Sequence, residues 1–262
     1  MAENDAVGAA LATEAAALAA GLAPMPPSCA SWPTRRPPCP APDWIRRDAL
    51  YATFRKPITA DHDANMKAIP RKQRAMVRKG IDHGLQAGTG RDVDLLHAIY
   101  AESVRNLGTP VFSRGYFRIL RETFAEAMDV VTITDAGRPV AAVMNFYWRD
   151  EVLPYYGGGT EAARRCHAND FMYWSVMRHA ADRGCRLFDF GRSKEGHGCL
   201  RVQEELGVPA DRAAVFLQSG TGQTIPENNP LKSEIRLMIA AWQKLPLGLA
   251  NRIGPFVVRG LG

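Results

Sequence analysis

The segment from Arg186 to Lys194, RLFDFGRSK, combines a short apolar strand with charged groups at its end. Asp189 lies between two phenylalanines, and an ionised carboxylate is costly to bury unpaired, so we expect it to have a cationic or N–H partner. It either ties down the following loop or serves as a site residue whose charge matters. Arg192 and Lys194 suit a carboxylate or a diphosphate, although a solvated loop would carry the same charges. Because charged groups at a strand end often build a site in α/β sheets, this segment is the first candidate.

The second feature is a cluster of positive charge. The chain has a net charge of +6, and the stretch from Ala64 to Gly80 contains six Lys and Arg residues and no acid. At 100° per residue a helix here would carry a basic stripe made of Lys67, Arg71, Arg74 and Arg78. Opposite it lies an apolar stripe of Met66, Ile69, Met76 and Val77. A tRNA, a lipid-linked diphosphate or an anionic membrane would fit such a face, and a merely solvated face is the alternative.

The elements that must position these groups follow in a regular order from residue 61. We expect the basic helix to begin or kink at Pro70. The pattern then predicts a strand near Leu85, helices over 93–106 and 114–127, a hairpin of 130–134 with 140–148, a strand over 152–158, a helix over 168–183, a strand over 186–190, a short helix over 200–206 and a strand over 213–219. In the 168–183 helix, Asn169 or Asp170 would cap the start and Gly184 the end. This order indicates an α/β protein with a mixed sheet.

The first 43 residues differ in character from the rest. Residues 6–21 read as an alanine-rich helix, and residues 22–43 contain eight of the 18 prolines. Because proline fits neither a helix interior nor a central strand, we expect residues 22–43 to be an irregular, extended linker or disordered.

Composition limits the compartment and the chemistry. Five scattered cysteines form no CxxC pair, which favours a reducing cytoplasm. Cys185, His197 and Cys199 fit no standard zinc spacing, so no metal is predicted. The N-terminus lacks the pattern of a signal peptide, and no apolar run is long enough to cross a bilayer. We therefore expect a cytoplasmic protein, with contact at the inner face of the membrane left open.

Several enzyme classes are disfavoured by missing motifs. The DFG at Asp189 to Gly191 has no accompanying HRD-type loop or glycine-rich loop, so it does not indicate a protein kinase. SGTGQT at residues 219–224 lacks the GK[ST] ending of a P-loop. No GxSxG is present, and no cysteine has a protease-like signature, which disfavours a Ser or Cys hydrolase.

From about Phe54 to the C-terminus the chain resembles the FemAB-like branch of the GNAT-fold acyltransferases. The runs that carry the resemblance are FRKPI at 54–58, DANMKAIPRKQRAMVRKG at 63–80, PYYGGG at 154–159, ANDFMYW…RG…FDFGRSK at 168–194 and NPLKSEIRLMIAAW at 229–242. It is most similar to members found beside bacterial exosortase and exopolysaccharide gene sets. The resemblance implies a GNAT-like acyl-CoA N-acyltransferase fold, with a mixed, mostly antiparallel central sheet flanked by helices.

The resemblance also implies a domain organisation. Relatives carry an additional GNAT-like domain upstream, so residues 1–58 are expected to be a remnant of such a first domain. Residues 59–262 would form a GNAT-like transferase domain with a C-terminal helical tail. That tail, with Lys244, Arg252 and Arg259, would pack on the domain or rest at a bilayer surface, and packing is favoured.

Direct transfer in this family needs no covalent nucleophile, because the acceptor amine attacks a bound ester or thioester. Tyr155 and Tyr156 lie where a GNAT fold opens its sheet, and strand alternation predicts that only one of them faces a given cleft. They join Asp189 and Lys194 as catalytic candidates. The substrate-binding candidates are Arg192, Asn145, Asn169, Gln203 and the basic stripe of Lys67, Arg71, Arg74 and Arg78. Gln203 stands where tRNA-dependent relatives have a lysine, so its charge is lost.

The resemblance therefore implies a cytoplasmic N-acyl- or aminoacyltransferase acting on an amine of a cell-wall or exopolysaccharide precursor. No tightly bound cofactor is expected, and the donor would be aminoacyl-tRNA, acyl-CoA or an acyl carrier. The expected partners are this donor, an anionic glycan or lipid-linked precursor, possible tRNA and a peripheral membrane contact. The alternative is a catalytically weakened relative that binds a polyanionic partner, which the incomplete first domain and Gln203 favour.

Overall fold

The computed structural model describes residues 28–30, 44–194, 210–218 and 233–258, with side chains over 53–191 and 236–258. The chain divides into two compact units, Met1–Arg55 with Arg192–Asn228, and Lys56–Gly191 with Asn229–Gly262. The predicted helices over 6–21 and 200–206 and the residue Gln203 lie outside the described residues.

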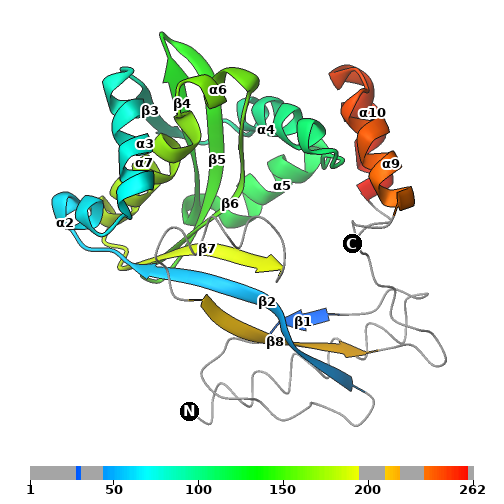
Figure 1. The fold of residues 1–262 in the computed structure, drawn as a ribbon, viewed down its shortest axis with the longest axis horizontal. Coiled ribbons are helices and arrows are strands. Elements are labelled where there is room, and N and C mark those ends of the chain that lie inside the picture. Colours follow the sequence, from blue (N-terminus) through cyan, green and yellow to red (C-terminus); the bar gives the residue numbers. More distant parts are fainter. Residues whose placement is uncertain (1–27, 31–43, 195–209, 219–232, 259–262) are drawn as a thin grey trace. The chain divides into compact units, whose positions relative to one another are not determined.

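The second unit holds most of the regular structure (Figure 1). Its elements follow one another as α2 (His62–Lys67), α3 (Arg71–Asp82), β3 (Gln86–Gly90), α4 (Val93–Leu107), α5 (Arg114–Phe124), the short 3₁₀ turn η1 (Ala125–Ala127), β4 (Met128–Asp135), β5 (Arg138–Trp148), β6 (Glu151–Gly159), α6 (Glu161–Arg165), α7 (Ala168–Asp182), β7 (Leu187–Lys194), α9 (Ser233–Gln243) and α10 (Leu247–Val258). The predicted order of helices and strands is confirmed over residues 61–190, apart from the division of the basic segment into two helices and the addition of the short elements η1 and α6.

The sheet of this unit has the order β7-β6-β5-β4-β3. β3, β4, β5 and β6 pair antiparallel in sequence, and β7 pairs parallel to β6. The β4–β5 hairpin closes through the left-handed residues Ala136 and Gly137, a conformation that matches the twist of paired strands. The mixed, mostly antiparallel sheet flanked by helices is the fold class expected from the sequence.

Helices cover both faces of the sheet. On one face α3 and α7 lie side by side, and their core includes Val77, Phe171, Met172 and Phe188. On the other face α4 and α5 bury a second core around Leu96, Phe117 and Met144, all at 0% exposure. The two cores account for the apolar alternation in β4 and β5, because successive strand residues point to opposite faces.

Local signals set the helix boundaries. Asp61 accepts hydrogen bonds from the first free N–H groups of α2, at 2.9 and 3.0 Å, and Asp92 and Ser113 cap α4 and α5 in the same way. Gly184 ends α7 in the left-handed conformation (φ 88°), as predicted. The helix α7 begins at Ala168, as predicted, but the predicted cap at Asn169 or Asp170 was wrong: His167 occupies the capping position without a side-chain hydrogen bond.

The basic segment forms two helices instead of one. α2 ends at Lys67, and Pro70 stands directly before α3, where its missing N–H costs no hydrogen bond. The possibility that a helix begins at Pro70 is confirmed, but Lys67 is not part of the same helix as the three arginines. Of the predicted apolar stripe, Ile69 and Val77 are buried at 6% and 3% exposure, and Met66 and Met76 are half-buried.

Within the second unit, the C-terminal helices α9 and α10 pack on α4. The Arg105 guanidinium donates to the carbonyl of Gln243 at 3.0 Å, and the Gln243 amide donates to the carbonyl of Asn106 at 3.1 Å. Gly254 in α10 lies so close to Val111 that an added Cβ would come within 2.9 Å of its carbonyl oxygen. The predicted packing of this tail is therefore confirmed. None of the helices in the described residues is long and apolar enough to cross a membrane.

The first unit contains β1 (Ser28–Ala30), β2 (Trp44–Pro57) and β8 (Ala210–Gln218), and β8 pairs antiparallel with both other strands. β1 lies inside the proline-rich segment, where we expected no regular element. Its three residues contain no proline, so each can donate a backbone hydrogen bond to a neighbouring strand.

Candidate functional site

The centre of the candidate site is the place where β6 and β7 separate. Among the described residues the two strands share the partner pairs Glu151↔Leu187 and Val152↔Phe188, although β6 continues to Gly159. Figure 1 shows the two strands diverging beyond these pairs. Parallel strands that leave a common ladder expose backbone N–H and C=O groups to a substrate.

A β-bulge lies in β6 next to this divergence. Asn145 is opposite Pro154 and Met144 is opposite Tyr156, so Tyr155 is an extra residue without a partner in β5. A bulge leaves the extra residue outside the ladder and redirects the neighbouring side chains. Such bulges are common beside active sites.

The bulge overturns the prediction that strand alternation separates the two tyrosines. The ring centroids of Tyr155 and Tyr156 are 4.8 Å apart, and Tyr155 also lies 6.4 Å from Phe146 on the face covered by α4 and α5. Tyr155 is 57% exposed, whereas Tyr156 is half-buried. The two rings therefore lie side by side, one toward solvent and one toward the core.

An aromatic cluster holds Tyr156 in place. Its hydroxyl shares a 2.7 Å hydrogen bond with the hydroxyl of Tyr116, and its ring contacts Tyr100, Phe112 and Phe117 edge-on. Burial, followed by the bond to Tyr116, raises the pKa of Tyr156, and burial raises the pKa of Tyr100 to about 12. These hydroxyls therefore remain protonated near neutral pH and can act as hydrogen-bond donors. Sequence reasoning missed Tyr100 and Tyr116, which come from α4 and α5.

Asp189 lies on β7 just beyond the last pair with β6. It is 3% exposed, and one carboxylate oxygen accepts from the backbone N–H of Gly191 at 2.7 Å. The expected N–H partner is confirmed. Gly191 has φ 77°, a conformation that favours glycine, so this short bond fixes a turn in the strand. Phe188 and Phe190 point to the α7 face, and alternation places Asp189 on the opposite face, which also carries Tyr156.

Among the described side chains, two further candidates, Asn145 and Asn169, do not lie at this point. Asn145 is fully buried and donates to Asp129 at 2.8 Å. Asn169 is exposed and approaches Gly159 at the far end of β6. Arg192 and Lys194 are the last residues of β7, and their side chains lie outside the described side chains.

Asp129 is the centre of a polar network that the sequence did not indicate. Its carboxylate accepts from Asn145 and from the Tyr147 hydroxyl at 2.8 Å each, and it lies 2.8 Å from the His179 ring. Burial would raise its pKa, but these hydrogen bonds outweigh burial and hold the pKa below the ordinary value. Arg183 stacks 4.0 Å from the Tyr147 ring. The network joins β4, β5 and α7 and so stabilises the sheet beneath the site.

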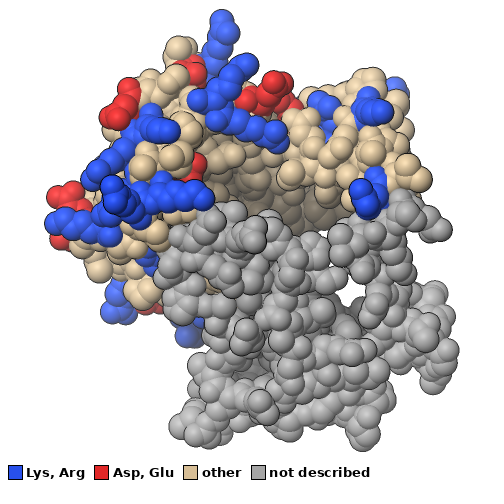
Figure 2. Space-filling model, in the orientation of Figure 1, with Lys and Arg blue, Asp and Glu red and all other residues tan. Residues whose placement is uncertain are grey.

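A separate basic surface covers α3. Arg71, Arg74 and Arg78 lie on its outer side, opposite the buried residues Gln73 and Val77. In Figure 2, Lys and Arg side chains gather on the side of the molecule where Figure 1 places α3. A shallow groove of about 330 Å³ runs there, lined by Arg71, Arg74, Ala75, Arg78, Lys79 and Asp82. The stripe predicted from the sequence therefore exists on α3, without Lys67.

Comparison with known proteins finds one family model and several solved structures that are similar to this chain. Residues 69–197 match a family model described as an acetyltransferase (GNAT) domain. The crystal structure of FemX superposes with a TM-score of 0.59 at 12% identity, covering 69% of this chain and 63% of FemX. The C-terminal DUF2156 domain of a proposed lysylphosphatidylglycerol synthetase from Agrobacterium fabrum gives 0.51 at 13% identity, covering 68% and 63%. None of the curated proteins compared with the chain matches it.

Residues 69–197 are thus similar to a GNAT acetyltransferase domain, and the likeness in fold to FemX covers more of the chain than this range alone. It spans about 63% of the length of both solved structures. At these identities the structural likeness defines the fold alone.

Proposed function

We propose that this chain is a FemAB-like N-acyl- or aminoacyltransferase whose reaction takes place at the divergence of β6 and β7. The observation that supports the proposal most directly is the bulge at Tyr155 beside a two-pair ladder. Both features free backbone groups at one place on the sheet. A transferase that works by direct attack needs such groups to hold an acyl carbonyl.

The proposed reaction forms one bond and breaks one. The nitrogen of the acceptor amine attacks the carbonyl carbon of a bound ester or thioester, and the carbon–oxygen or carbon–sulfur bond then breaks. A backbone N–H released by the bulge would stabilise the oxyanion between these two steps. The amine proton would pass to Asp189 or to water, and the leaving atom would take a proton at the tyrosine pair.

Tyr156 and Tyr116 suit the role of donor to the leaving group. In a pair of hydroxyls one donates to the other, which leaves one O–H proton for a ligand. The raised pKa of Tyr156 keeps that proton in place near neutral pH. The exposed ring of Tyr155 beside the pair provides a surface on which the acceptor could pack.

The substrate proposal rests on charge. The arginines of α3 favour a polyanionic donor such as aminoacyl-tRNA, with acyl-CoA or an acyl carrier as the other possibilities. The proposed acceptor is an amine of a cell-wall or exopolysaccharide precursor, which brings a lipid-linked anionic partner and a peripheral membrane contact. The two similar structures, FemX and the domain of a lysylphosphatidylglycerol synthetase, agree by name with this proposal, although those names concern the other proteins.

The rival proposal is a catalytically weakened relative that binds a polyanion. The same arginines favour it, because binding needs the α3 surface and not the strand divergence. Gln203, expected in place of a family lysine, also belongs to this proposal. The two proposals differ in whether any acyl group is transferred.

A transfer assay with the full chain tests the choice. Purified protein would be incubated with labelled aminoacyl-tRNA, acyl-CoA or acyl carrier, together with amine acceptors from cell-wall and exopolysaccharide precursors, and the products read by mass spectrometry. We expect transfer from one donor class, reduced about tenfold or more by Tyr156→Phe. Tyr147→Phe is the matched control, because its hydroxyl bonds Asp129 on the other face of the sheet. Binding without transfer from any donor would favour the rival proposal.

A further inference from the structure

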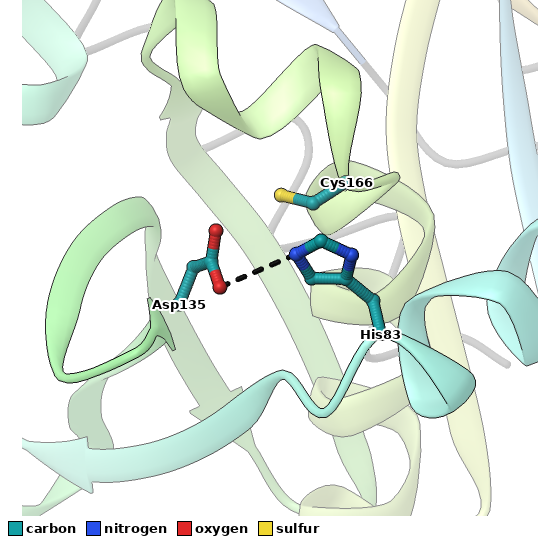
Figure 3. A group of neighbouring side chains, drawn as sticks. All are labelled: His83, Asp135 and Cys166. Carbon is teal, nitrogen blue, oxygen red and sulfur yellow. Dashed lines mark ion pairs between the residues drawn. The ribbon is translucent and has the colours of Figure 1, made fainter.

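Three side chains of different chemistry meet at one end of the second unit. They are His83, Asp135 and Cys166, and Figure 3 shows all three directed toward a common space. One ligand atom from each lies within 4.8 Å of the other two. The nitrogen Nε2 of His83 is 3.3 Å from an oxygen of Asp135. An imidazole nitrogen, a carboxylate oxygen and a thiolate sulfur are each zinc ligands.

The backbone holds each of the three residues at a fixed boundary. His83 follows the last residue of α3 and donates its N–H to the carbonyl of Lys79 at 2.9 Å. Asp135 is the last residue of β4 and pairs with Arg138 across the hairpin. Cys166 follows α6 directly. The ligands therefore come from three separate connections of the fold, each tied to a helix or a strand.

The separations fit a metal site after a small adjustment. In a tetrahedral zinc site with bonds of about 2.0–2.3 Å, the ligand atoms lie roughly 3.3–3.8 Å apart. The His83–Asp135 distance already meets this value, and the sulfur has to approach by about 1 Å. Cys166 is 3% exposed and fixed, whereas the side chains of His83 and Asp135 are 46% and 36% exposed. The two exposed side chains can therefore rotate toward the sulfur at little cost.

A His–Asp pair and a buried free cysteine also occur elsewhere in the described residues, but separately from each other. His62 and Asp182 form an ion pair of 2.9 Å, and Cys185 is a second buried free thiol. Within the described ranges, His83, Asp135 and Cys166 alone bring histidine, carboxylate and thiol to one point. A surface ion pair between histidine and aspartate does not need a buried cysteine beside it. Ion pairing alone therefore does not explain why Cys166 lies next to His83 and Asp135.

We infer that His83, Asp135 and Cys166 bind one Zn²⁺ ion through nitrogen, oxygen and sulfur. The thiolate makes a hard cation such as Mg²⁺ or Ca²⁺ a poor occupant. The bound ion links the end of α3, the β4–β5 hairpin and the end of α6. Because α6 directly follows the bulged strand β6, the ion stabilises the connection from β6 to α7. A fourth position on the solvent side takes water.

Cobalt substitution tests the site in the full chain. Protein freed of metal by chelation is titrated with Co²⁺, which gives a thiolate-to-cobalt absorption band only when sulfur coordinates. We expect one Co²⁺ per chain, displacement by one equivalent of Zn²⁺, and a higher melting temperature with Zn²⁺ than without. His83→Gln should weaken metal binding tenfold or more, and Cys166→Ser should abolish the band.

Two variants serve as matched controls. His62→Gln removes the histidine of a His–Asp pair without a thiol, and Cys185→Ser removes the other buried thiol. Both should keep the band and the affinity of the unaltered chain. Since His83 is exposed, His83→Gln remains informative if Cys166→Ser fails to fold. Absence of the band, or a band that survives His83→Gln and Cys166→Ser at full strength, overturns the inference. Neither result bears on acyl transfer, which is assayed separately.

Discussion

At the scale of residues, the buried carboxylate of Asp189 shows how one side chain can combine a structural and a chemical task. One of its oxygens accepts from Gly191 and fixes a left-handed glycine at the end of the β6–β7 pairing. That task needs an acceptor but no charge. Proton transfer from an amine needs the charge, so the two tasks can be separated by substitution.

We predict that Asp189→Asn lowers the rate of transfer by a factor of about ten or more while the fold is kept. The asparagine oxygen can still accept from Gly191, so the turn should survive. The rate would be measured with the donor identified in the transfer assay, and folding by thermal melting. An unchanged rate together with a lower melting temperature would assign Asp189 a structural role alone.

At the scale of elements, close packing between α3 and α7 positions the basic surface on the domain. A Cβ added at Gly80 would lie 2.8 Å from the Cβ of Phe171, so glycine is what allows the two helices to approach. The same contact fixes which side of α3 faces outward, and that side carries the arginines.

We predict that Gly80→Ala destabilises the protein by about 1–2 kcal/mol. Overpacking lowers the free energy of unfolding by roughly 1–3 kcal/mol, and the better helix propensity of alanine offsets at most about 1 kcal/mol of this loss. Gly115→Ala is the control, because a Cβ there meets nothing closer than 3.7 Å. It should be neutral or slightly stabilising in urea unfolding. Equal effects of the two substitutions would refute the packing argument.

The α3 surface should bind a polyanion through several phosphates at once. Replacing Arg71, Arg74 and Arg78 by glutamine should flatten the slope of log affinity for bulk tRNA against log salt by about two units. The matched control replaces the exposed arginines 138, 149 and 252, which removes the same net charge from other elements. Parallel measurements with anionic lipid vesicles distinguish a membrane from a tRNA. If tRNA and vesicles both fail to bind at low salt, the stripe is only a solvated face.

At the scale of the whole molecule, buried titratable groups link stability to pH. His97 is 3% exposed, and burial lowers its pKa below the ordinary value of 6.5. Asp129 has a pKa held below 3.8 by its hydrogen bonds. In both cases the unfolded chain binds protons at a higher pH than the folded one, so acid favours unfolding.

We predict that the free energy of unfolding falls in two stages as the pH is lowered. The first begins as the pH drops through 6.5, where His97 is protonated in the unfolded chain, and the second begins below 3.8 through Asp129. His97→Gln should remove the first stage and leave the second. Denaturant unfolding followed from pH 8 to pH 3 measures both. A first stage that persists in His97→Gln would mean that another group is responsible.

The sequence by itself determined what depends on near neighbours. Gly184 as a helix end and Pro70 as a helix start were predicted, and both act over a few residues, as do the caps Asp92 and Ser113 that the structure shows. Because such signals are local, pattern reasoning recovered the order of elements. The glycine that would satisfy Asp189 is likewise two residues away.

Only the tertiary structure decided which distant residues meet. The bulge that brings Tyr155 and Tyr156 to one side depends on the register between β5 and β6, which a single strand does not encode. Partners such as Tyr116 for Tyr156, or His179 for Asp129, are 40 and 50 positions apart. The His83, Asp135 and Cys166 cluster has no regular spacing at all. Local patterns fix elements because they are governed by local geometry, whereas a site depends on long-range packing that decides which elements touch.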